Sequence, residues 1–493
     1  MKRYQHLAMI AHDMGIVSEL LGAVTLTPLI VLVVFREWDM LIPMLSVPAT
    51  FFILGVLISR VPRSEHTPHL SVALVTAAIT WMVVAIIGAL PFVLGMHMSW
   101  TDSIFEAMSG WTGTGYTVMP SLDTTPHVII FWRSFIQWIG GIGVIAFGVA
   151  LLSRSGIAST RLFRAEGRPD AFMPSVASTG KRIWGMYLIL TVIFIGLVSL
   201  AGEPLWDTVN LVMVSLATGG FAPHDAGIGF YNNPLFEGLL LVPMLAGMFP
   251  FKVYFVLFKG DVRVMFRNGA VRAILALAFL SSTIVSLYLY FFNHLPLTTA
   301  VRQGFFNTIS GFATCGLQNA NPHLWVAQPI IMITIMMVIG GAAGSTAGGI
   351  KVDRLILGYT GLIWGFKRYF VRGNVIVPFK HEGRIIPKNT TELELSKNML
   401  IIILWLIMLF LATMLVLTLV PTIAENFGTH EVLFELVSAM SNVGLGLGIL
   451  TPTSPVVIKW IYTFLMWVGR LEIVPVLILL MGLLKGFESG VAK

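Results

Sequence analysis

Four short runs with a common outline recur along the chain, each an apolar helical stretch that leads into a turn and then a glycine. They read FEAMSGWTGTGYT (105–117), NLVMVSLATGGFA (210–222), FFNTISGFATCGLQ (305–318) and FELVSAMSNVGLG (434–446). Each run lies between two stretches long enough to cross a bilayer. The recurrence predicts four diverged copies of one unit, span, re-entrant run and span, in a single polypeptide.

Composition assigns the chain to membranes. Of its 493 residues 56% are hydrophobic and 11% are charged, with a mean hydropathy of +0.85, which excludes a single water-soluble globule. The net charge of +7 comes from basic residues dispersed through short loops, a pattern of membrane orientation and not of nucleic-acid binding. The single cysteine, Cys315, excludes an intrachain disulfide and a Cys-based metal site.

Ten apolar stretches have the length that a bilayer requires. We expect spans at 15–35, 41–59, 70–95, 129–152, 183–201, 235–258, 271–292, 328–349, 396–420 and 456–484. The predicted fold class is therefore an all-α polytopic membrane protein, in which two extra N-terminal helices precede four pseudo-repeats of helix, re-entrant pore helix with filter loop, and helix. The predicted segments are the extension at 1–65 and repeats at 66–168, 169–268, 269–390 and 391–493.

Lys and Arg concentrate on one side of these spans, and cytoplasmic loops carry such an excess. The N-terminus and the loops after spans two, four, six and eight hold nearly all of them, whereas the other side offers little beyond Arg36 and Lys459. Both termini are predicted to be cytoplasmic, and all four runs to enter from outside.

The copies align on their glycines, Gly115, Gly220, Gly316 and Gly444. A serine stands six residues before three of them, whereas the second run has Val214 there, and Ser215 suggests a slip of one residue. Gly219 therefore competes with Gly220 as the second glycine. We favour Gly220, because Phe221 then follows it as Tyr116 and Leu317 follow theirs.

Glycine allows backbone carbonyls to point into a narrow axis and replace the hydration shell of an ion, because it tolerates positive φ and lacks a Cβ. The sequence thus predicts one cation filter made by four turns, without the carboxylate ring that would favour divalent ions. A single such glycine is explained as well by helix packing; four in corresponding places favour a pore. The predicted filter residues are Gly113, Thr114, Gly115, Thr218, Gly219, Gly220, Thr314, Cys315, Gly316, Asn442, Val443 and Gly444.

Over essentially its whole length the chain resembles the TrkH family, the membrane subunits of bacterial Trk potassium uptake systems in the Trk/Ktr/HKT superfamily. The resemblance rests on the segments SGWTGTGYTV, ATGGFAPHDAGIG, QWIGGIGVIAFGVALL, RLFRAEG, IGGAAGSTAGGIKVDRL, SNVGLGLG and GRLEIVPVLILL, which occur in the family's order. It implies potassium uptake across the bacterial cytoplasmic membrane, with K⁺ bound only at the filter, and no enzyme activity. The chain departs from the pattern at Gly113, Tyr116 and Cys315.

Span eight contains too many small residues for one continuous helix, since each glycine costs about 1 kcal/mol relative to alanine. Close helix packing is one explanation; the resemblance implies the other, a loop that gates the pore beneath the filter. The predicted gate residues are Gly340, Gly341, Gly344, Ser345, Thr346, Gly348, Gly349 and Lys351, together with Arg470 from span ten.

Arg470 is a charge well inside span ten, which costs about 2.5–3.5 kcal/mol on insertion scales unless it is paired or wetted. The resemblance implies that it faces the pore under the filter. The alternative is an ion pair with Glu472. Three other acidic residues, Asp102, Asp207 and Glu435, lie near the predicted starts of pore helices, where negative charge offsets the helix dipole and attracts cations to the outer mouth.

Regulation has to come from another protein, because the stretch from about 350 to 395 is too short for a nucleotide-binding domain and contains no GxGxxG or Walker pattern. The resemblance implies a homodimer docked to a cytoplasmic Rossmann-type (RCK/TrkA-like) ring that binds NAD or ATP, with basic segments 154–182 and 351–397 as the docking surfaces. A secondary transporter coupled to Na⁺ or H⁺ is the alternative function, although four parallel copies favour a channel-like pore.

Overall fold

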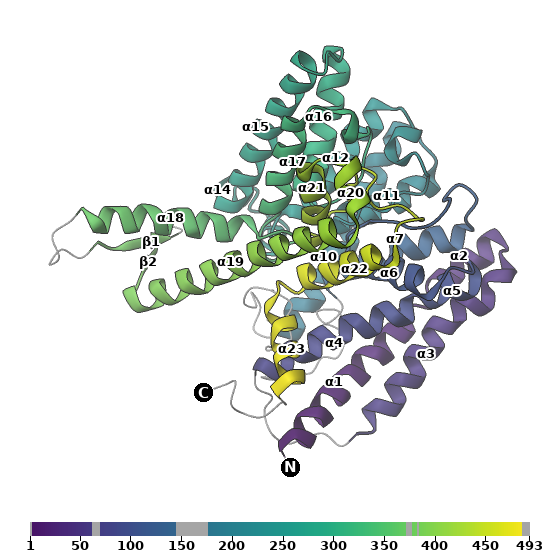
Figure 1. Ribbon diagram of the computed structural model, residues 1–493. Coiled ribbons are helices and arrows are strands. Elements are labelled where there is room, and N and C mark those ends of the chain that lie inside the picture. The colour runs from purple at the N-terminus through teal and green to yellow at the C-terminus, as the bar shows by residue number, and fades with distance from the viewer. Residues whose placement is uncertain (1, 62–69, 144–175, 371–376, 382–383, 486–493) are drawn as a thin grey trace.

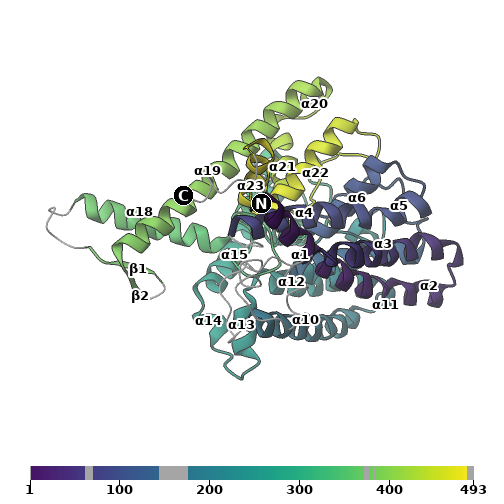
Figure 2. The same cartoon turned by 90° about the horizontal axis from the view of Figure 1, so that it is seen from below.

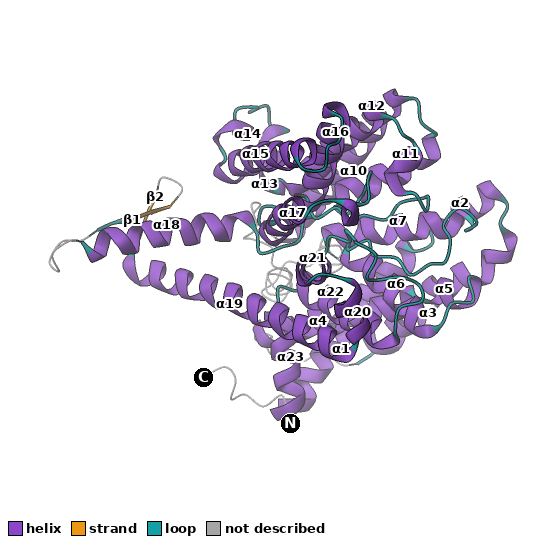
Figure 3. Ribbon diagram, turned by 45° about the horizontal axis from the view of Figure 1, so that its top comes forward, coloured by secondary structure: helices purple, strands orange, loops and turns teal. Residues whose placement is uncertain are grey.

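The computed structural model describes residues 2–61, 70–143, 176–370, 377–381 and 384–485. Helices make up most of these residues, and the hairpin of β1 (Phe379–His381) and β2 (Arg384–Ile386) is their only sheet (Figure 3). Six helices are long and apolar enough to cross a bilayer: Ile10–Phe35, Trp38–Ser59, Ser71–Gly95, Ser178–Ala201, Gly269–Phe291 and Thr391–Leu419. They correspond to the predicted spans one, two, three, five, seven and nine.

The N-terminal extension is a pair of antiparallel spans attached to the first repeat. It consists of α1 (Lys2–Val24), α2 (Pro28–Phe35), η1 (Trp38–Met40) and α3 (Leu41–Ser59). The backbones of α1 and α3 approach closely at Gly15 and Gly55, where a built Cβ would lie about 3 Å from the opposite backbone. Glu37 then accepts hydrogen bonds from the amides of His127 (2.7 Å) and Val128 (2.8 Å), and so caps the next repeat's second span.

Four repeats follow, each with a short helix between two further helical elements. Repeat 1 contains α4 (Leu70–Gly88), α5 (Leu90–Gly95), α6 (Trp100–Thr112) and α7 (His127–Ile142). Repeat 2 contains α10 (Val176–Val198), η2 (Ser199–Ala201), α11 (Leu205–Ala217), η3 (Gly227–Phe230), α12 (Pro234–Met248), α13 (Phe251–Leu257) and α14 (Val264–Arg267). Repeat 3 contains α15 (Gly269–Phe291), α16 (Leu297–Phe312), η4 (Pro322–Leu324), α17 (Ala327–Ile339), α18 (Val352–Tyr369) and the hairpin. Repeat 4 contains α19 (Lys388–Leu419), α20 (Pro421–Asn426), α21 (Thr429–Met440), α22 (Val456–Arg470) and α23 (Val474–Lys485).

The short helices α6, α11, α16 and α21 are the four predicted re-entrant runs. They have 13, 13, 16 and 12 residues, and at 1.5 Å per residue none reaches across about 30 Å of hydrocarbon. Their C-terminal halves are buried almost completely. Each of these helices therefore ends inside the protein, next to its glycine.

Two spans that the sequence predicts as continuous are sharply bent, and the prediction is wrong there. The helices α12 and α13 meet at 103°, because Pro250 has no amide to donate and forces Phe249 into an extended conformation. The helices α22 and α23 meet at 112°, where Glu472 and Ile473 both adopt positive φ. Span eight is interrupted as expected, since α17 ends at Ile339 and α18 begins at Val352.

One arm extends from the helical body. It is made of α18, the hairpin and the first part of α19, and it projects to the left in Figure 1 and Figure 2. The stretch from about 350 to 395, expected as a basic segment outside the membrane, is thus largely helical. Most of the basic segment 154–182, and the last part of predicted span four, lie outside the described residues.

Candidate functional site

The four turns that follow α6, α11, α16 and α21 share one backbone conformation. Each has positive φ at its glycine and again two residues earlier. The pairs are Gly113 (69°) and Gly115 (94°), Thr218 (54°) and Gly220 (90°), Thr314 (53°) and Gly316 (85°), and Asn442 (55°) and Gly444 (92°). Gly219 is not among the residues with positive φ, so Gly220 is the second glycine of the set.

The same hydrogen bond closes every turn. The amide of the residue before the glycine donates to the carbonyl five residues earlier, at 2.8–2.9 Å, in the pairs Thr114–Ser109, Gly219–Val214, Cys315–Ser310 and Val443–Ser438. Val214 therefore occupies the position of the three serines, and the slip suggested by Ser215 is absent. The second run therefore differs from the other three in the side chain at this position, whereas its backbone conformation is the same.

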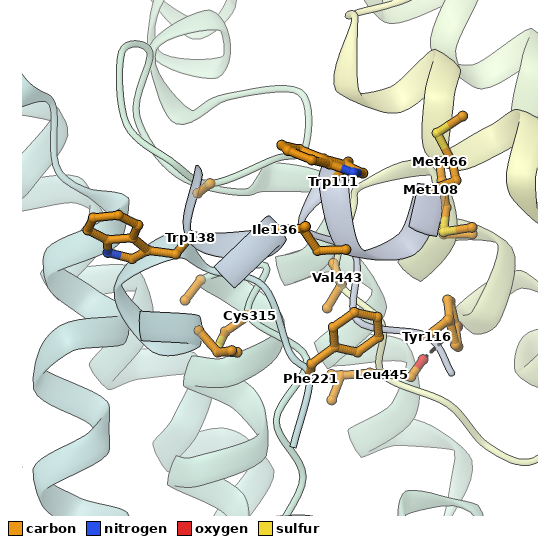
Figure 4. Packing of buried hydrophobic residues seen from close by; sticks show 14 of the residues in the cluster. Met108, Trp111, Tyr116, Ile136, Trp138, Phe221, Cys315, Val443, Leu445 and Met466 are labelled. Carbon is orange, nitrogen blue, oxygen red and sulfur yellow. Dashed lines mark hydrogen bonds between the residues drawn. The ribbon is translucent and has the colours of Figure 1, made fainter. Parts of the chain in front are cut away.

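The four turns close into a ring, which we call the glycine ring. A Cβ built on Gly115 would overlap the carbonyl oxygen of Gly219, one on Gly220 that of Cys315, one on Gly316 that of Val443, and one on Gly444 that of Thr114. The repeats thus follow one another in cyclic order, and no side chain fits at any of the four glycines. Aromatic and aliphatic side chains, including Phe221, Val443 and Leu445, pack around the turns (Figure 4).

Two fully buried carboxylates hold the segments that follow the turns. Glu435 of α21 accepts from the amides of Leu447 (2.7 Å) and Ile449 (2.9 Å) and from the Tyr462 hydroxyl (3.0 Å). The expectation that it attracts cations at the outer mouth is therefore wrong. Asp102 and Asp207 do lie in the first turns of α6 and α11.

Glu106 of α6 is the second of these carboxylates. It accepts from the Val118 amide (3.0 Å) and from Nε of Arg133 (2.9 Å), whose Nη1 donates to the Ala222 carbonyl (3.0 Å). The guanidinium also lies 4.0 Å from the centre of the Phe221 ring. This buried ion pair ties the segments after the first and second turns together.

A cavity of about 450 Å³ lies on one side of the ring and is lined by all four glycines and by the residues that follow them. His224 and Asp225 stand at its wall. His224 lies between Asp123 (2.7 Å) and Asp207 (3.3 Å). Slight burial raises the pKa of Asp225, but hydrogen bonds from the Leu122 amide (2.7 Å) and the Ser121 hydroxyl (2.9 Å) outweigh it and hold that pKa below its usual value.

Residues 340–351, which we call the inner loop, lie on the other side of the ring. The Thr346 hydroxyl donates to the carbonyls of Leu216 (3.0 Å) and Gly247 (2.9 Å), and the Gly348 amide donates to the Thr314 hydroxyl (2.7 Å). A Cβ on Gly348 would overlap the Ser441 carbonyl oxygen. The loop thus touches repeats 2, 3 and 4, and Gly340, Gly344, Gly349 and Lys351 all adopt positive φ within it.

Arg470 connects the inner loop with repeat 1. It is the last residue of α22, beside the bend, and it donates to the carbonyls of Thr346 (3.3 Å), Gly141 (3.1 Å) and Gly140. Glu472 pairs with Arg354 instead, so the proposed Arg470–Glu472 pair is wrong. Arg470, residues of the inner loop and Asn442 together line a small cavity of about 30 Å³.

All predicted filter residues therefore lie at the ring, and all predicted gate residues lie at or beside the inner loop. Sequence reasoning missed Glu106, Arg133 and Gln137, all of which contact the turns or their continuations. Arg133 and Gln137 stand four residues apart on α7, hence on one face of an otherwise apolar helix. Two polar residues on one face of a membrane span are the sequence feature that could have pointed to this site.

The sequence and the fold are similar to those of known proteins. The family model described as TrkH, cation transport protein, matches residues 45–485. An uncharacterised cation transporter of Methanocaldococcus jannaschii is 30% identical over 95% of this chain and 94% of its own length, and the Trk system potassium uptake protein TrkH of Escherichia coli K12 is 30% identical over 81% of this chain and 83% of its own. The crystal structure of the potassium transporter TrkH from Vibrio parahaemolyticus superimposes with a TM-score of 0.82 at 25% identity, covering 96% of this chain and 98% of that one. The chain therefore belongs to the TrkH family of cation transport proteins.

Proposed function

We propose that the protein takes up K⁺ across the bacterial cytoplasmic membrane through one central pore, with the glycine ring as its selectivity filter. The observation that carries the proposal is the ring itself, in which each glycine lies against a carbonyl of the next repeat. Relatives in Escherichia coli and Vibrio parahaemolyticus bear potassium-uptake names. The wide cavity on one side of the ring supplies a water-accessible approach.

Carbonyl oxygens suit a weakly hydrated monovalent cation, because several neutral oxygens can replace its water shell without binding it too tightly to leave. The filter positions are Gly113 to Gly115, Thr218 to Gly220, Thr314 to Gly316 and Asn442 to Gly444, none of which is a carboxylate. All four pore helices end at the ring, so that the negative ends of their dipoles favour a cation there.

The inner loop is the proposed gate. It contacts three of the four repeats directly beneath the ring, and Arg470 extends the contact to the fourth. Opening then requires that the loop leave its hydrogen bonds to the turns, and Arg470 sets an electrostatic barrier for cations below the filter.

Control comes from outside the chain in this proposal, from a cytoplasmic Rossmann-type ring of the RCK/TrkA kind that binds NAD or ATP and docks on a homodimer. The basic residues Lys259, Arg263 and Arg267 near α14, and Lys367 and Arg368 at the end of α18, are suitable docking groups if both termini are cytoplasmic. Single cysteines introduced at Arg263 and Asn321 test this orientation with an impermeant thiol reagent, since the native Cys315 is buried. Labelling of position 263 from outside would reverse the assignment.

Flux in liposomes tests the function. We expect passive K⁺ flux down a fixed gradient, with Na⁺ flux much lower, and no requirement for Na⁺ or a pH gradient. Gly316→Ser should weaken the discrimination, because the added side chain overlaps the Val443 carbonyl. Transport that stops without a Na⁺ or proton gradient would instead indicate a coupled transporter, and unchanged discrimination in Gly316→Ser would refute the filter.

A further inference from the structure

Gln137 spans the second turn of the glycine ring. It extends from α7 and is fully buried, and its Nε2 donates to the Gly219 carbonyl (2.5 Å) while its Oε1 accepts from the Phe221 amide (3.1 Å). One side-chain amide thus holds the backbone on both sides of Gly220. The carbonyl that it holds is the one that faces Gly115 in the ring.

Two of the other three turns are held by a serine of their own pore helix, whereas the Ser310 hydroxyl of the third turn has no hydrogen-bond partner among the described residues. In the first and fourth turns the hydroxyls of Ser109 and Ser438 accept from the amides of Gly115 (3.1 Å) and Gly444 (3.0 Å). The equivalent position in the second repeat is Val214, which has no hydrogen-bonding group. Gln137, on the neighbouring helix, instead bonds the residues on either side of Gly220.

Gln137 also explains the second glycine of the ATGG segment. Gly219 does not have positive φ, so conformation alone does not require glycine there. A Cβ on Gly219 would however lie 2.6 Å from Oε1 and 2.7 Å from Cδ of Gln137. The glycine makes space for the amide, and the two residues form one unit.

We propose that Gln137 is a positioning residue for ion selectivity, which holds the Gly219 carbonyl and the Phe221 amide of the one turn that lacks the serine. The proposal rests on the ring being the filter. A backbone turn freed of these hydrogen bonds can change its conformation, so the ring then discriminates less well between ions of different size.

The test compares initial K⁺ and Na⁺ uptake by the full-length protein in liposomes. Gln137→Leu should lower the K⁺/Na⁺ ratio by about tenfold, equivalent to about 1.4 kcal/mol. Val214→Ser in the Gln137→Leu background should restore part of the ratio, since the serine hydroxyl then reaches the turn from the equivalent position. Gln328→Leu, an exposed glutamine at the start of α17, is the matched control and should leave the ratio unchanged.

Gln137→Glu tests the same point if the leucine variant does not fold. It keeps the acceptor for Phe221 but removes the donor to Gly219, so the ratio should fall as well. An unchanged ratio in both Gln137 variants, while Gly316→Ser loses discrimination, would overturn the role of Gln137 and leave the filter standing. An unchanged ratio in Gly316→Ser would overturn the filter first.

Discussion

The amide of Gly348 donates a hydrogen bond of 2.7 Å to the hydroxyl of Thr314, so the inner loop is fastened directly to the third glycine turn. Thr314 is fully buried and holds a left-handed φ of 53°. One residue therefore belongs both to the ring and to the anchorage of the loop. Any movement of the loop has to break this bond.

Thr314→Val keeps the shape of the side chain and removes the acceptor. Loss of about 1 kcal/mol of hydrogen bonding should shift the balance toward a displaced loop by about fivefold and raise flux without activation. Liposome flux at fixed protein density measures this. Thr334→Val, whose hydroxyl bonds only within α17 to Ile330, is the control. Equal flux in both variants would argue that the loop does not gate.

Arg470→Ala removes hydrogen bonds to three carbonyls and a positive charge under the ring. We expect a several-fold rise in basal flux and altered rectification, since hydrogen bonds from charged groups contribute about 1.5–3 kcal/mol each. Arg470→Lys should restore part of the barrier but not the contacts. Single-channel recording in planar bilayers gives both quantities, with Arg368→Ala, an exposed arginine of α18, as the matched change. Unaltered rate and rectification would contradict the barrier role.

Gly444→Ala should abolish selective flux. Its φ of 92° is unfavourable for alanine by about 1–2 kcal/mol, and the methyl group would overlap the Thr114 carbonyl oxygen. Gly185→Ala is the comparison, because nothing lies within 4 Å of a Cβ there and the residue is near the middle of α10. That variant should conduct normally and be slightly more stable. Thermal unfolding in detergent separates loss of conduction from loss of folding.

The buried Glu106–Arg133 pair should show strong coupling. Removing one partner, as in Glu106→Gln or Arg133→Met, leaves the other charge buried and should lower the free energy of unfolding by about 3–5 kcal/mol. The double variant should cost much less than the sum of the two. Denaturant unfolding of the four proteins completes the cycle, and the exposed pair Arg368–Glu392, expected at about 0–1 kcal/mol, calibrates it. Additive effects at the buried pair would refute the coupling.

Asp225 follows the second turn and accepts hydrogen bonds from Ser121 and Leu122, which follow the first turn. The stability of this link should depend on pH. The pKa of Asp225 in the folded protein lies below the unfolded value, so its contribution to stability is complete above the unfolded pKa of about 4 and is lost as the pH falls through the folded pKa. The melting temperature of wild type should exceed that of Asp225→Asn at pH 7, and the two should converge in acid. Asp39→Asn, at an exposed aspartate in η1, should not show this convergence.

Local patterns in the sequence were sufficient for the place of six of the ten predicted spans and for the positions of the four turns. Both depend on short-range properties, apolar length and the special conformations of glycine. The bend at Glu472 was missed although Gly469 and Pro475 flank it in the sequence, and the ion-pair partner of Glu472, Arg354, lies in another repeat.

The same distinction between local patterns and distant contacts applies to the site residues. The ring glycines are visible in each run by itself, whereas Glu435 was misassigned because its role depends on the chain folding back 12 residues later onto its carboxylate. Gln137 was missed because its function exists only opposite Gly219, 82 residues away. Contacts between segments that are separated in the sequence decide the roles of these side chains. Such contacts produce no periodic pattern in the local sequence.

The ring is assembled from four unequal parts of one polypeptide, and this changes what mutation can do to it. In a homotetramer every substitution is made four times at once, so a mild defect is multiplied around the axis. Here a change at Val214 or Cys315 alters one quarter of the wall and leaves the rest intact. Such a protein can tune its ion preference in small steps, one quadrant after another.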